Sequence, residues 1–407
     1  MSLETSPNKG PLSGVTVLEL AHVMAGPTCG RLLADMGADV IKLERLEGED
    51  CRRMAPPWQG DEAAGFLMLN RNKRGIAVNL KTSEGRQIVL DLIGKTDVLI
   101  ENFRKGAMER LGLGFEELRT INPGLIYCEI SGFGRTGPYA DKGGFDVVAQ
   151  AMSGVLSVTG ERERRPPVKA GVPVADIGAG LYATIGILAA YVERQRTGKG
   201  QRVDTSLMEA AASFMTWPAA SYFASREIAT PMGTAHPLDA PYQAFEASDG
   251  WFIVGAANQS NWLRLTKAID AGHLANDARF LENPDRVKNL DALVDELSAI
   301  FAQNTKAHWI AVLDGAGVPT GPINNVQEML EDPQINARDM VVTVEHETLG
   351  TVKTLGLPIR FSESATPIKK GAPTLGGDTI GVLTELGYED EKIKQLIAGD
   401  IVKVIGG

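Results

Sequence analysis

The sequence predicts an α/β fold in which a parallel sheet, covered by helices on both faces, is joined to a smaller α+β domain. Over the first 130 residues, apolar strand patterns alternate with helical patterns, as they do in parallel sheets. From about residue 226 the pattern changes to a hairpin followed by helices. A chain of 407 residues is also longer than one hydrophobic core normally supports, so we expect two domains.

The first part of the chain contains five predicted strands, which lie at residues 15–20, 39–44, 75–80, 97–102 and 125–131. Helical spacing at 26–36 and 83–94 separates members of this series. Ligands bind such sheets beyond the carboxyl ends of the strands. Asn102, Ser131 and the loop 21–27 occupy those ends. We therefore expect the functional site at this edge of the sheet.

The remaining elements complete two domains. A long apolar helix at 175–196 is followed by a turn, a short strand at 201–205 and a helix at 207–222. Ser248-Asp249-Gly250 predicts a hairpin between strands 240–245 and 251–255, with helices after it from 260, at 290–302 and at 306–316. The stretch 350–373 is extended, and helices follow at 378–386 and 390–398. We expect residues 1–225 and 326–407 to form the large domain and residues 226–325 the small one.

The composition excludes several classes of function. A formal net charge of −10 disfavours nucleic acid or an anionic membrane as a partner, although a few cations still make a pocket for an anionic ligand. Three cysteines lack CxxC spacing and five histidines lack metal-ligand spacing, so we expect free thiols and no metal site. The amino end has no apolar h-region. These features favour the cytosol, or an organelle matrix if a presequence precedes this chain.

Asp176 stands among glycines and alanines at the start of the long apolar helix. One interpretation is a helix N-cap, a position that aspartate favours. The other is a nucleophilic carboxylate, because small neighbours let a bulky substrate approach and glycine N–H groups stabilise an oxyanion. A helix amino end stabilises the anion but lowers its basicity. The two interpretations are compatible.

A glycine-rich stretch follows the fifth strand, with glycines at 132, 134, 137, 143 and 144. It suits a close approach of the backbone to a ligand, and a plain turn explains it equally well. Asp146 and Gln150 follow one helical turn apart, so they can face one site together.

Basic residues gather after the predicted strand ends, where a phosphorylated ligand would lie; they are Arg45, Lys73, Arg74, Arg104, Lys105 and Arg110. Most lysines and arginines are solvated surface, which is the alternative here. The loop 21–27 lacks GxGxxG, so the fingerprint of a nicotinamide-dependent oxidoreductase is missing. Parallel α/β architecture alone does not establish that function.

Together these segments resemble one family, the class III coenzyme A transferases of the formyl-CoA transferase and carnitine or bile-acid CoA transferase type. The resemblance runs from about residue 12 to 401. It rests on an ordered set of motifs: Ala25-Gly26-Pro27, residues 37–44, Asn72-Lys73-Arg74, Glu101-Asn102-Phe103, residues 134–138, residues 146–154 and Val174-Ala175-Asp176.

The resemblance implies a Rossmann-like large domain built from both chain ends, a small domain between them, and a homodimer of interlocked subunits. It implies that Asp176 attacks the donor thioester, forming a mixed anhydride and free CoA thiolate. CoA then attacks the aspartyl carbonyl, and the acceptor acid collects CoA through a second anhydride. Acyl-CoA is the substrate, and no tightly bound cofactor is expected.

The resemblance also implies contacts. CoA would meet His22, Val23, Arg45, Lys73, Asn102, Phe103 and Arg110, and the substrate would meet Met24, Asp146, Gln150 and His236. The formyl-CoA enzymes carry glutamine where this chain has Met24, and a run of glycines that residues 241–255 lack. The stretch 235–250 is more similar to members acting on C4 to C6 dicarboxylic acids, so we expect succinyl-CoA or a similar donor.

Two alternatives remain. Racemases of 2-methylacyl-CoA resemble this chain but pair the aspartate with a histidine, and two-base proton transfer needs both residues. Phe145 occupies that position here. A non-catalytic CoA-binding scaffold is the other alternative, and the presence of Asp176 argues against it.

Overall fold

The computed structural model describes residues 9–162, 165–366 and 368–405, which form two compact units. The large unit takes in the described residues up to Val155, Lys169–Ala219 and those from Pro333 onward. The small unit takes in Ala220–Asp332 and the described part of Leu156–Val168. Sequence analysis placed the small domain at 226–325 and left 156–168 in the large one, so the units divide the chain differently.

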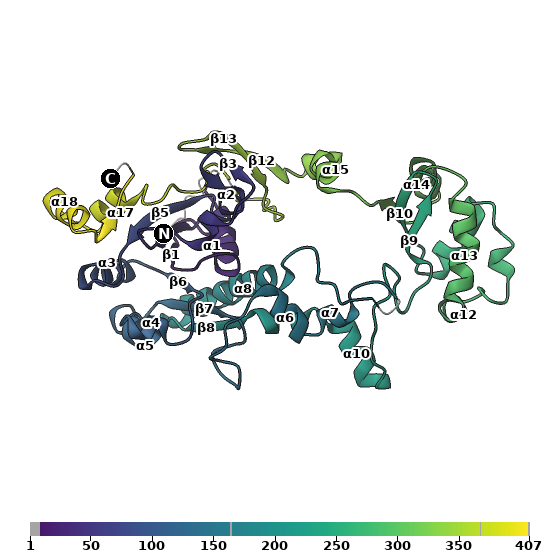
Figure 1. Cartoon of the computed structure of the whole chain (residues 1–407), viewed down its shortest axis with the longest axis horizontal. Helices are drawn as coiled ribbons and strands as arrows, with labels where there is room; N and C mark the ends of the chain where they lie inside the picture. The colour runs from purple at the N-terminus through teal and green to yellow at the C-terminus, as the bar shows by residue number, and fades with distance from the viewer. Residues whose placement is uncertain (1–8, 163–164, 367, 406–407) are drawn as a thin grey trace. The chain divides into compact units, whose positions relative to one another are not determined.

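A seven-stranded sheet organises the large unit, in the order β14-β5-β2-β1-β6-β7-β8 (Figure 1). Its strands are β1 (Thr16–Glu19), β2 (Asp39–Glu44), β5 (Lys73–Val78), β6 (Val98–Glu101), β7 (Ile126–Ser131), β8 (Arg202–Ser206) and β14 (Val402–Lys403). All neighbours pair in parallel except β14, which runs antiparallel to β5. The predicted α/β fold with a parallel sheet is confirmed, and β14 is an edge strand that sequence analysis missed.

Successive side chains of each strand point to opposite faces of the sheet, so alternate residues pack into the two different cores on those faces. Val17 belongs to the core beneath α1 (Ala25–Asp35) and α8 (Val174–Thr197). Its neighbour Leu18 belongs to the core beneath α3 (Ser83–Ile93), α17 (Thr379–Glu385) and α18 (Asp390–Ala398). Strands buried on both faces explain the continuous apolar runs in the sequence.

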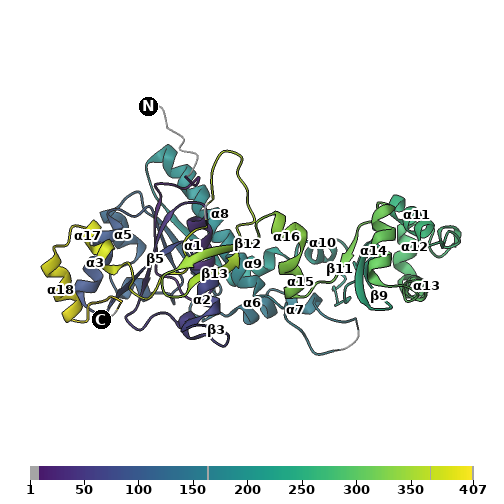
Figure 2. The same ribbon diagram turned by 90° about the horizontal axis from the view of Figure 1, so that it is seen from above.

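The end of the chain completes the large unit. The strands β12 (Val341–His346) and β13 (Gly350–Leu355) form a hairpin, and α17, α18 and β14 follow it. In Figures 1 and 2 the last helices, α17 and α18, lie beside α3 on the side of the sheet where β5 runs. Residue 367, within the predicted extended stretch 350–373, and residues 1–8 of the predicted large domain are outside the described residues.

The small unit holds a three-stranded sheet of β9 (Tyr242–Ala247), β10 (Gly250–Gly255) and β11 (Thr320–Pro322). β9 and β10 form the predicted hairpin. Helices α11 (Gln259–Ala268), α12 (Asn283–Lys288), α13 (Leu290–Phe301) and α14 (Lys306–Gly315) follow, and α15 (Val326–Glu331) comes later. Trp262, Phe245 and Phe301 belong to a core of this unit's own.

The shorter elements connect these layers. They are the 3-10 helices Asp50–Arg53 and Leu274–Asn276, the strands β3 (Trp58–Gln59) and β4 (Glu62–Ala63), and the helices α2 (Ala64–Leu69), α4 (Ala107–Arg110), α5 (Phe115–Ile121), α6 (Asp146–Met152), α7 (Val155–Val158), α9 (Leu207–Ser213), α10 (Thr216–Ser225) and α16 (Pro333–Ala337). The predicted helix 207–222 is thus two helices, α9 and α10.

By length and composition, α8 is the one helix in the described part of the chain that could cross a membrane. The core helix of a globular fold meets the same criteria, and 44% of its apolar window is buried within the structure. Ala175, Ala179, Ala183 and Ile187 belong to the core of the large unit.

Candidate active site

Two adjoining cavities open at the carboxyl ends of the parallel strands in the large unit, where sequence analysis expected the site. The first has a volume of about 580 Å³ and follows β1, β2 and β5. The second has a volume of about 460 Å³ and follows β1, β6 and β7. His22, Asp50 and Phe103 line both cavities, so the two join at these residues.

Asp176 lines the second cavity and is half-buried there. The N-cap of α8 is Pro173, so Asp176 is the third residue of the helix. The interpretation of Asp176 as the N-cap is therefore wrong. The capping group comes from another helix: Asp146 Oδ1 accepts hydrogen bonds from Ala175 N at 2.9 Å and from Asp176 N at 3.4 Å.

Gln150 holds Asp146 in this position. Its Nε2 donates to Asp146 Oδ2 at 2.6 Å, and its Oε1 accepts from Ala170 N at 3.0 Å. The side chain of Gln150 is fully buried. Asp146 and Gln150 lie on one face of α6 and bond to each other, but neither lines the first or the second cavity, so their predicted facing of a ligand site is not seen. They lie behind Asp176 and support the first turn of α8.

Electrostatics make Asp176 a more basic carboxylate than an ordinary aspartate. Burial, and secondarily the charge of Asp146, raise the pKa of Asp176 to about 6. The amino end of α8 acts in the opposite direction, since it favours an anion. Burial disfavours the ionised form of Asp176, and the like charge of Asp146 adds to that effect. At neutral pH the group is largely ionised, and its oxygen is a stronger nucleophile than at an ordinary pKa.

Asp176 differs from the other acids on the second cavity by having no cationic partner among the described residues. Asp50 pairs with Arg45 at 2.5 Å and with Arg53 at 2.8 Å. Asp141 lies 3.8 Å from Lys105 and is 89% exposed. A carboxylate without a counter-ion keeps its lone pairs available for a reacting carbon.

The loop between β1 and α1 lines the second cavity with His22, Val23 and Met24. Asn102 binds its backbone twice: Oδ1 accepts from His22 N at 3.0 Å, and Nδ2 donates to His22 O at 2.8 Å. Burial lowers the pKa of His22 below its ordinary value. Val23 has a φ of 63°, a left-handed conformation that costs a β-branched residue about 1–3 kcal/mol.

Phe103 sits where the two cavities join, with its ring 5.6 Å from that of His22. Its backbone is fixed on both sides. Phe103 N donates to Glu101 Oε2 at 2.6 Å, and Arg135 Nη1 donates to Phe103 O at 2.9 Å. Arg135 also forms a buried ion pair with Glu101. Burial raises the pKa of Glu101 to about 7.

The glycine-rich stretch makes close backbone packing possible. A Cβ on Gly132 would meet Gly144 Cα at 2.6 Å, and one on Gly144 would meet Gly132 Cα at 2.5 Å. Both glycines line the second cavity. The close approach in the structure is between two parts of this stretch, whereas the prediction concerned an approach of the backbone to a ligand; Phe145, next to Gly144, also lines the cavity.

Besides Asp146 and Gln150, three predicted contact residues line neither cavity. Lys73 is fully buried and pairs with Glu19 at 2.7 Å, because its side chain points inward from β5. Burial lowers the pKa of Lys73 to about 8. Arg110 is exposed on α4 and lines neither cavity. His236 belongs to the small unit, 3.2 Å from Asp239.

Five cations outside the contact set that the resemblance implied line the cavities, and two of them, Arg104 and Lys105, belong to the basic group noted in the sequence. Lys81 joins Arg45 on the first, and Arg104, Lys105 and Lys142 line the second. Lys81 follows β5 by three residues, so the rule that ligands lie beyond strand ends points to it rather than to Lys73. Arg135, noted only within a motif, also lines the second cavity. These cations suit an anionic ligand on an acidic chain.

Cysteine and metal chemistry have no support in the described residues. Cys29, Cys51 and Cys128 are buried free thiols. Burial raises the thiol pKa of Cys29 to about 12 and that of Cys51 to about 11, so thiolates are disfavoured. Among the residues that the structure describes, no three His, Cys, Asp or Glu side chains come together in a group able to hold a metal ion.

This chain is similar to known proteins along most of its length. CoA-transferase family III matches residues 12–379. An acyl-CoA transferase of Fusarium pseudograminearum is 41% identical over 399 residues, which cover 95% of this chain and 87% of that protein. The succinyl-CoA:glutarate CoA-transferase of Homo sapiens is 38% identical over 397 residues, covering 97% and 90%. The crystal structure of a CAIB/BAIF family protein from Brucella suis has a TM-score of 0.84 and 42% identity, covering 93% of this chain and all of that one.

Proposed function

Because this chain belongs to CoA-transferase family III, we propose that it moves coenzyme A from succinyl-CoA, or a similar dicarboxylyl-CoA, to a dicarboxylic acid through a covalent intermediate on Asp176. Family membership over residues 12–379 makes the chain an enzyme that transfers CoA between acyl-CoA and carboxylic acids. The observation that carries the covalent step is the half-buried Asp176 carboxylate on the second cavity, which has no cationic partner among the described residues.

The proposed reaction proceeds through two anhydrides. A carboxylate oxygen of Asp176 attacks the thioester carbonyl of the donor, the C–S bond breaks, and CoA leaves as a thiolate. The thiolate attacks the aspartyl carbonyl and releases the donor acid, which leaves an aspartyl thioester. The acceptor carboxylate then displaces CoA to form a second anhydride. CoA attacks the acceptor acyl carbon and regenerates Asp176, so no net proton is consumed.

A carboxylate nucleophile suits this task because the anhydride and thioester intermediates conserve the energy of the donor thioester. Water must be kept from them, since hydrolysis would release that energy. The raised pKa of Asp176 fits both halves of the cycle. A raised pKa makes the carboxylate oxygen of Asp176 more nucleophilic. The burial that raises it also favours the uncharged anhydride and thioester forms of the side chain.

The first cavity is proposed to hold the nucleotide end of CoA. Its volume of about 580 Å³ is of the size typical of ligand sites, and Leu80 and Leu111 give it apolar walls. Arg45 and Lys81 supply positive charge for phosphates. The pantetheine arm would then pass His22 and Phe103, where the cavities join, and bring the thioester to Asp176.

The dicarboxylic substrate class rests on two observations. The relative from Homo sapiens is named for succinyl-CoA and glutarate, both derived from dicarboxylic acids. The second cavity is lined by Arg104, Lys105 and Lys142, whose charges suit the free carboxylate at the far end of such an acyl group. Met24 also lines this cavity, and its apolar side chain suits the methylene chain between the two carboxyl carbons.

We further propose a homodimer. An apolar stripe on α8, formed by Leu181, Ile185 and Val192, is exposed to 44%, 60% and 70%. Large exposed apolar patches mark surfaces that bind a partner. A second copy of the chain, interlocked as the family resemblance implies, would cover this stripe.

The test begins with CoA exchange between succinyl-CoA and a panel of C4 to C6 dicarboxylic acids. Asp176→Ala is expected to abolish exchange while CoA still binds, with Asp390→Ala as an exposed acidic control on α18. Mass spectrometry of enzyme quenched with donor alone should find the acyl or CoA adduct on the peptide containing residue 176. Exchange by Asp176→Ala at the wild-type rate would contradict the assignment.

The racemase alternative is tested in the same preparation. Phe145 lines the second cavity where a racemase would need its histidine. Wild-type enzyme incubated with a 2-methylacyl-CoA in deuterium oxide should incorporate no deuterium at the α-carbon. Incorporation without CoA exchange would favour racemisation over transfer.

A further inference from the structure

The loop between β1 and α1 is held at four backbone atoms by three side chains from elsewhere in the large unit. Asn102 binds the N–H and the carbonyl of His22. Lys42 Nζ donates to Ala21 O at 3.0 Å. Glu49 Oε2 accepts from Val23 N at 2.6 Å. This loop carries His22, Val23 and Met24 on the wall of the second cavity, which Asp176 also lines.

Val23 is the point of conformational strain in this loop. Six non-glycine residues in the described part of the chain have a positive φ, and Val23 is the β-branched one among them. Such a residue returns to the extended region unless its surroundings prevent it. The N–H of Val23 points at Glu49, so the hydrogen bond to that carboxylate is a restraint that opposes the return.

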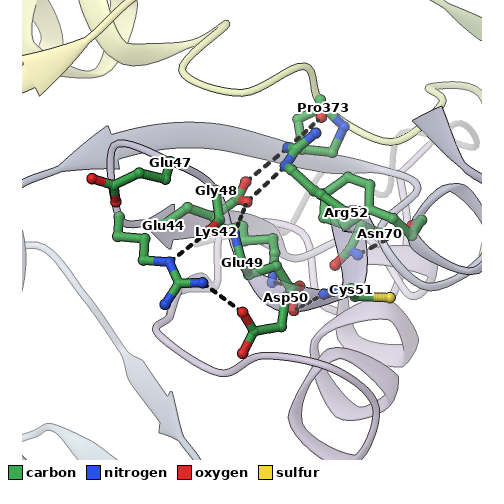
Figure 3. A network of polar contacts seen from close by, with 12 residues as sticks. Lys42, Glu44, Glu47, Gly48, Glu49, Asp50, Cys51, Arg52, Asn70 and Pro373 are labelled. Atoms are coloured by element: carbon green, nitrogen blue, oxygen red, sulfur yellow. Dashed lines mark hydrogen bonds and ion pairs between the residues drawn. The ribbon is translucent and has the colours of Figure 1, made fainter. Parts of the chain in front are cut away.

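Glu49 is anchored independently of any ligand. Its side chain is 5% exposed, and its Oε1 lies 2.8 Å from Lys42 Nζ, which is itself paired with Glu19 at 3.0 Å. The backbone N–H of Glu49 donates to Glu44 Oε2 at 3.0 Å. Figure 3 shows Lys42, Glu44, Glu49 and Arg52 gathered in this network.

The network reaches the end segment of the chain. Arg52 grips Glu44 through Nε at 2.7 Å and Nη2 at 2.8 Å. The same Nη2 donates to Pro373 O at 2.9 Å (Figure 3). The anchor of Glu49 is therefore built from buried ion pairs, which hold a fixed geometry when every charge is paired.

Only a carboxylate suits this position. Glu49 must accept a charged donor on one oxygen and the Val23 N–H on the other. A glutamine of the same shape offers one acceptor and one donor group. Whichever way its amide turned, an N–H would face either Lys42 or the Val23 N–H, and one of the two contacts would be lost.

We propose that Glu49 is a positioning residue for CoA transfer: its carboxylate holds Val23 in the left-handed conformation and thereby fixes His22 and Met24 against the reacting groups at Asp176. Glu49 lines the first cavity but is not among the residues that line the second, where Asp176 and the proposed acyl site lie. The inference rests on the proposed function, because its main measurement is CoA exchange. Small displacements of positioning groups lower turnover more than they lower substrate affinity.

A double-mutant cycle of Glu49→Gln with Val23→Gly tests this proposal. Glu49→Gln is expected to lower kcat for exchange by roughly 10-fold to 100-fold, with KM for succinyl-CoA changed by less than about 3-fold. In the Val23→Gly background the further loss caused by Glu49→Gln should shrink to less than about 3-fold, because glycine adopts a positive φ without strain.

Glu62→Gln is the matched control. Glu62 is a carboxylate of the same network, 3.3 Å from Arg52 Nη1 and 18% exposed. It forms its ion pair with Arg52 and does not bind the backbone of the loop between β1 and α1. It is expected to keep kcat within about 2-fold of wild type. The thermal midpoints of all variants are measured as well. A general loss of stability in Glu49→Gln would lower the midpoint, and its effect on kcat would then be the same in the wild-type and Val23→Gly backgrounds.

Two results would overturn the proposal. One is a folded Glu49→Gln enzyme whose kcat stays within about 2-fold of wild type. The other is an equal loss in the wild-type and Val23→Gly backgrounds, which would leave Glu49 a purely structural residue. If Glu49→Gln does not fold, Glu49→Asp is used in the same cycle, because it keeps both acceptors but draws them back by one methylene.

Failure of the proposed function is recognised separately. If wild-type enzyme exchanges CoA with no acid in the panel, the substrate proposal fails, and the cycle is repeated on the Kd for CoA measured by calorimetry. The loop lines both cavities through His22, so a Kd weakened by Glu49→Gln and restored in the Val23→Gly background supports the positioning role. Absence of coupling in Kd overturns it.

Discussion

Asp146 caps the helix on which Asp176 stands, with its Oδ1 2.9 Å from the N–H of Ala175 and 3.4 Å from that of Asp176. One side chain thus does two things to the proposed nucleophile. It fixes the first turn of α8, and its charge helps to raise the pKa of Asp176 to about 6 after the larger contribution of burial. Both effects on Asp176 come from Asp146, which lies outside α8, so the sequence of α8 alone does not produce them.

Replacing Asp146 by asparagine should change the pH dependence of exchange. Asp146→Asn keeps an acceptor for the helix amides but removes the charge, so the pKa of Asp176 should fall from about 6 toward its ordinary value. The acidic limb of the kcat/KM profile should move to lower pH, and its plateau should drop because the nucleophile becomes less basic. An unmoved limb would show that Asp146 does not influence the nucleophile.

Asp176→Asn should stabilise the fold at neutral pH while it abolishes exchange. The folded-state pKa of about 6 lies above the ordinary 3.8, so the ionised side chain disfavours the folded state as pH rises through this interval. Below about 3.8 both states are protonated and the penalty disappears. We expect a gain on the order of 1 kcal/mol above pH 6, or about 1–2 °C in Tm for a unit of this size, and no gain at pH 3.5.

Arg135→Ala should destabilise the large unit by about 3–5 kcal/mol, since it leaves Glu101 buried without its cation. Arg202→Ala is the comparison. Arg202 also pairs with a glutamate, Glu129 at 3.0 Å, but its side chain is 43% exposed, so a loss of less than about 1 kcal/mol is expected. Urea unfolding followed by circular dichroism measures both. Equal losses would contradict the role assigned to burial.

CoA affinity should separate Lys81 from Arg110. Lys81 lines the first cavity and Arg110 lies on the exposed side of α4. Lys81→Ala should raise the Kd for CoA by roughly 10-fold, as expected for a lost phosphate contact of about 1–2 kcal/mol, and should weaken its dependence on salt. Arg110→Ala should leave the Kd within about 2-fold. A larger increase in Kd for Arg110→Ala than for Lys81→Ala would instead support the contact between CoA and Arg110 that the resemblance implied.

Ile185→Asp should disrupt the proposed homodimer. The side chain is 60% exposed at the centre of the apolar stripe on α8, so a charge there is harmless in a monomer but unfavourable in a buried interface. Sedimentation velocity should show a dimer for wild type and a smaller species for the variant. Lys199→Asp, in the exposed turn after α8, is the control and should not alter the assembly.

Much of the architecture followed from local patterns. Apolar runs located the parallel strands, because strands buried on both faces carry apolar residues without interruption. The motif around Asp176, through the family resemblance, singled out the residue that we propose as nucleophile before any geometry was known. The strand β14 escaped detection because Val402–Lys403 is a two-residue pairing, too short to show a period.

The predicted CoA contact at Lys73 depended on the direction of its side chain, which the sequence does not give. Lys73 and Lys81 both lie near an end of β5, but Lys73 points into the sheet and pairs with Glu19, whereas Lys81 lines the first cavity. The sequence places a residue along a strand, and pairing with strands distant in the chain then decides whether its charge is buried or exposed.

Local pattern in the sequence was thus enough for the α/β class and for the edge of the sheet at which the two cavities open, whereas Asp176 as the proposed nucleophile came from the family resemblance. Two contacts arose only in the folded chain. Asp146 caps the helix of Asp176 from 30 residues away, and Glu49 accepts a hydrogen bond from Val23 N. The physical reason is that periodicity and motifs are properties of neighbouring residues. Burial, charge and hydrogen bonding between distant residues exist only once packing brings them together.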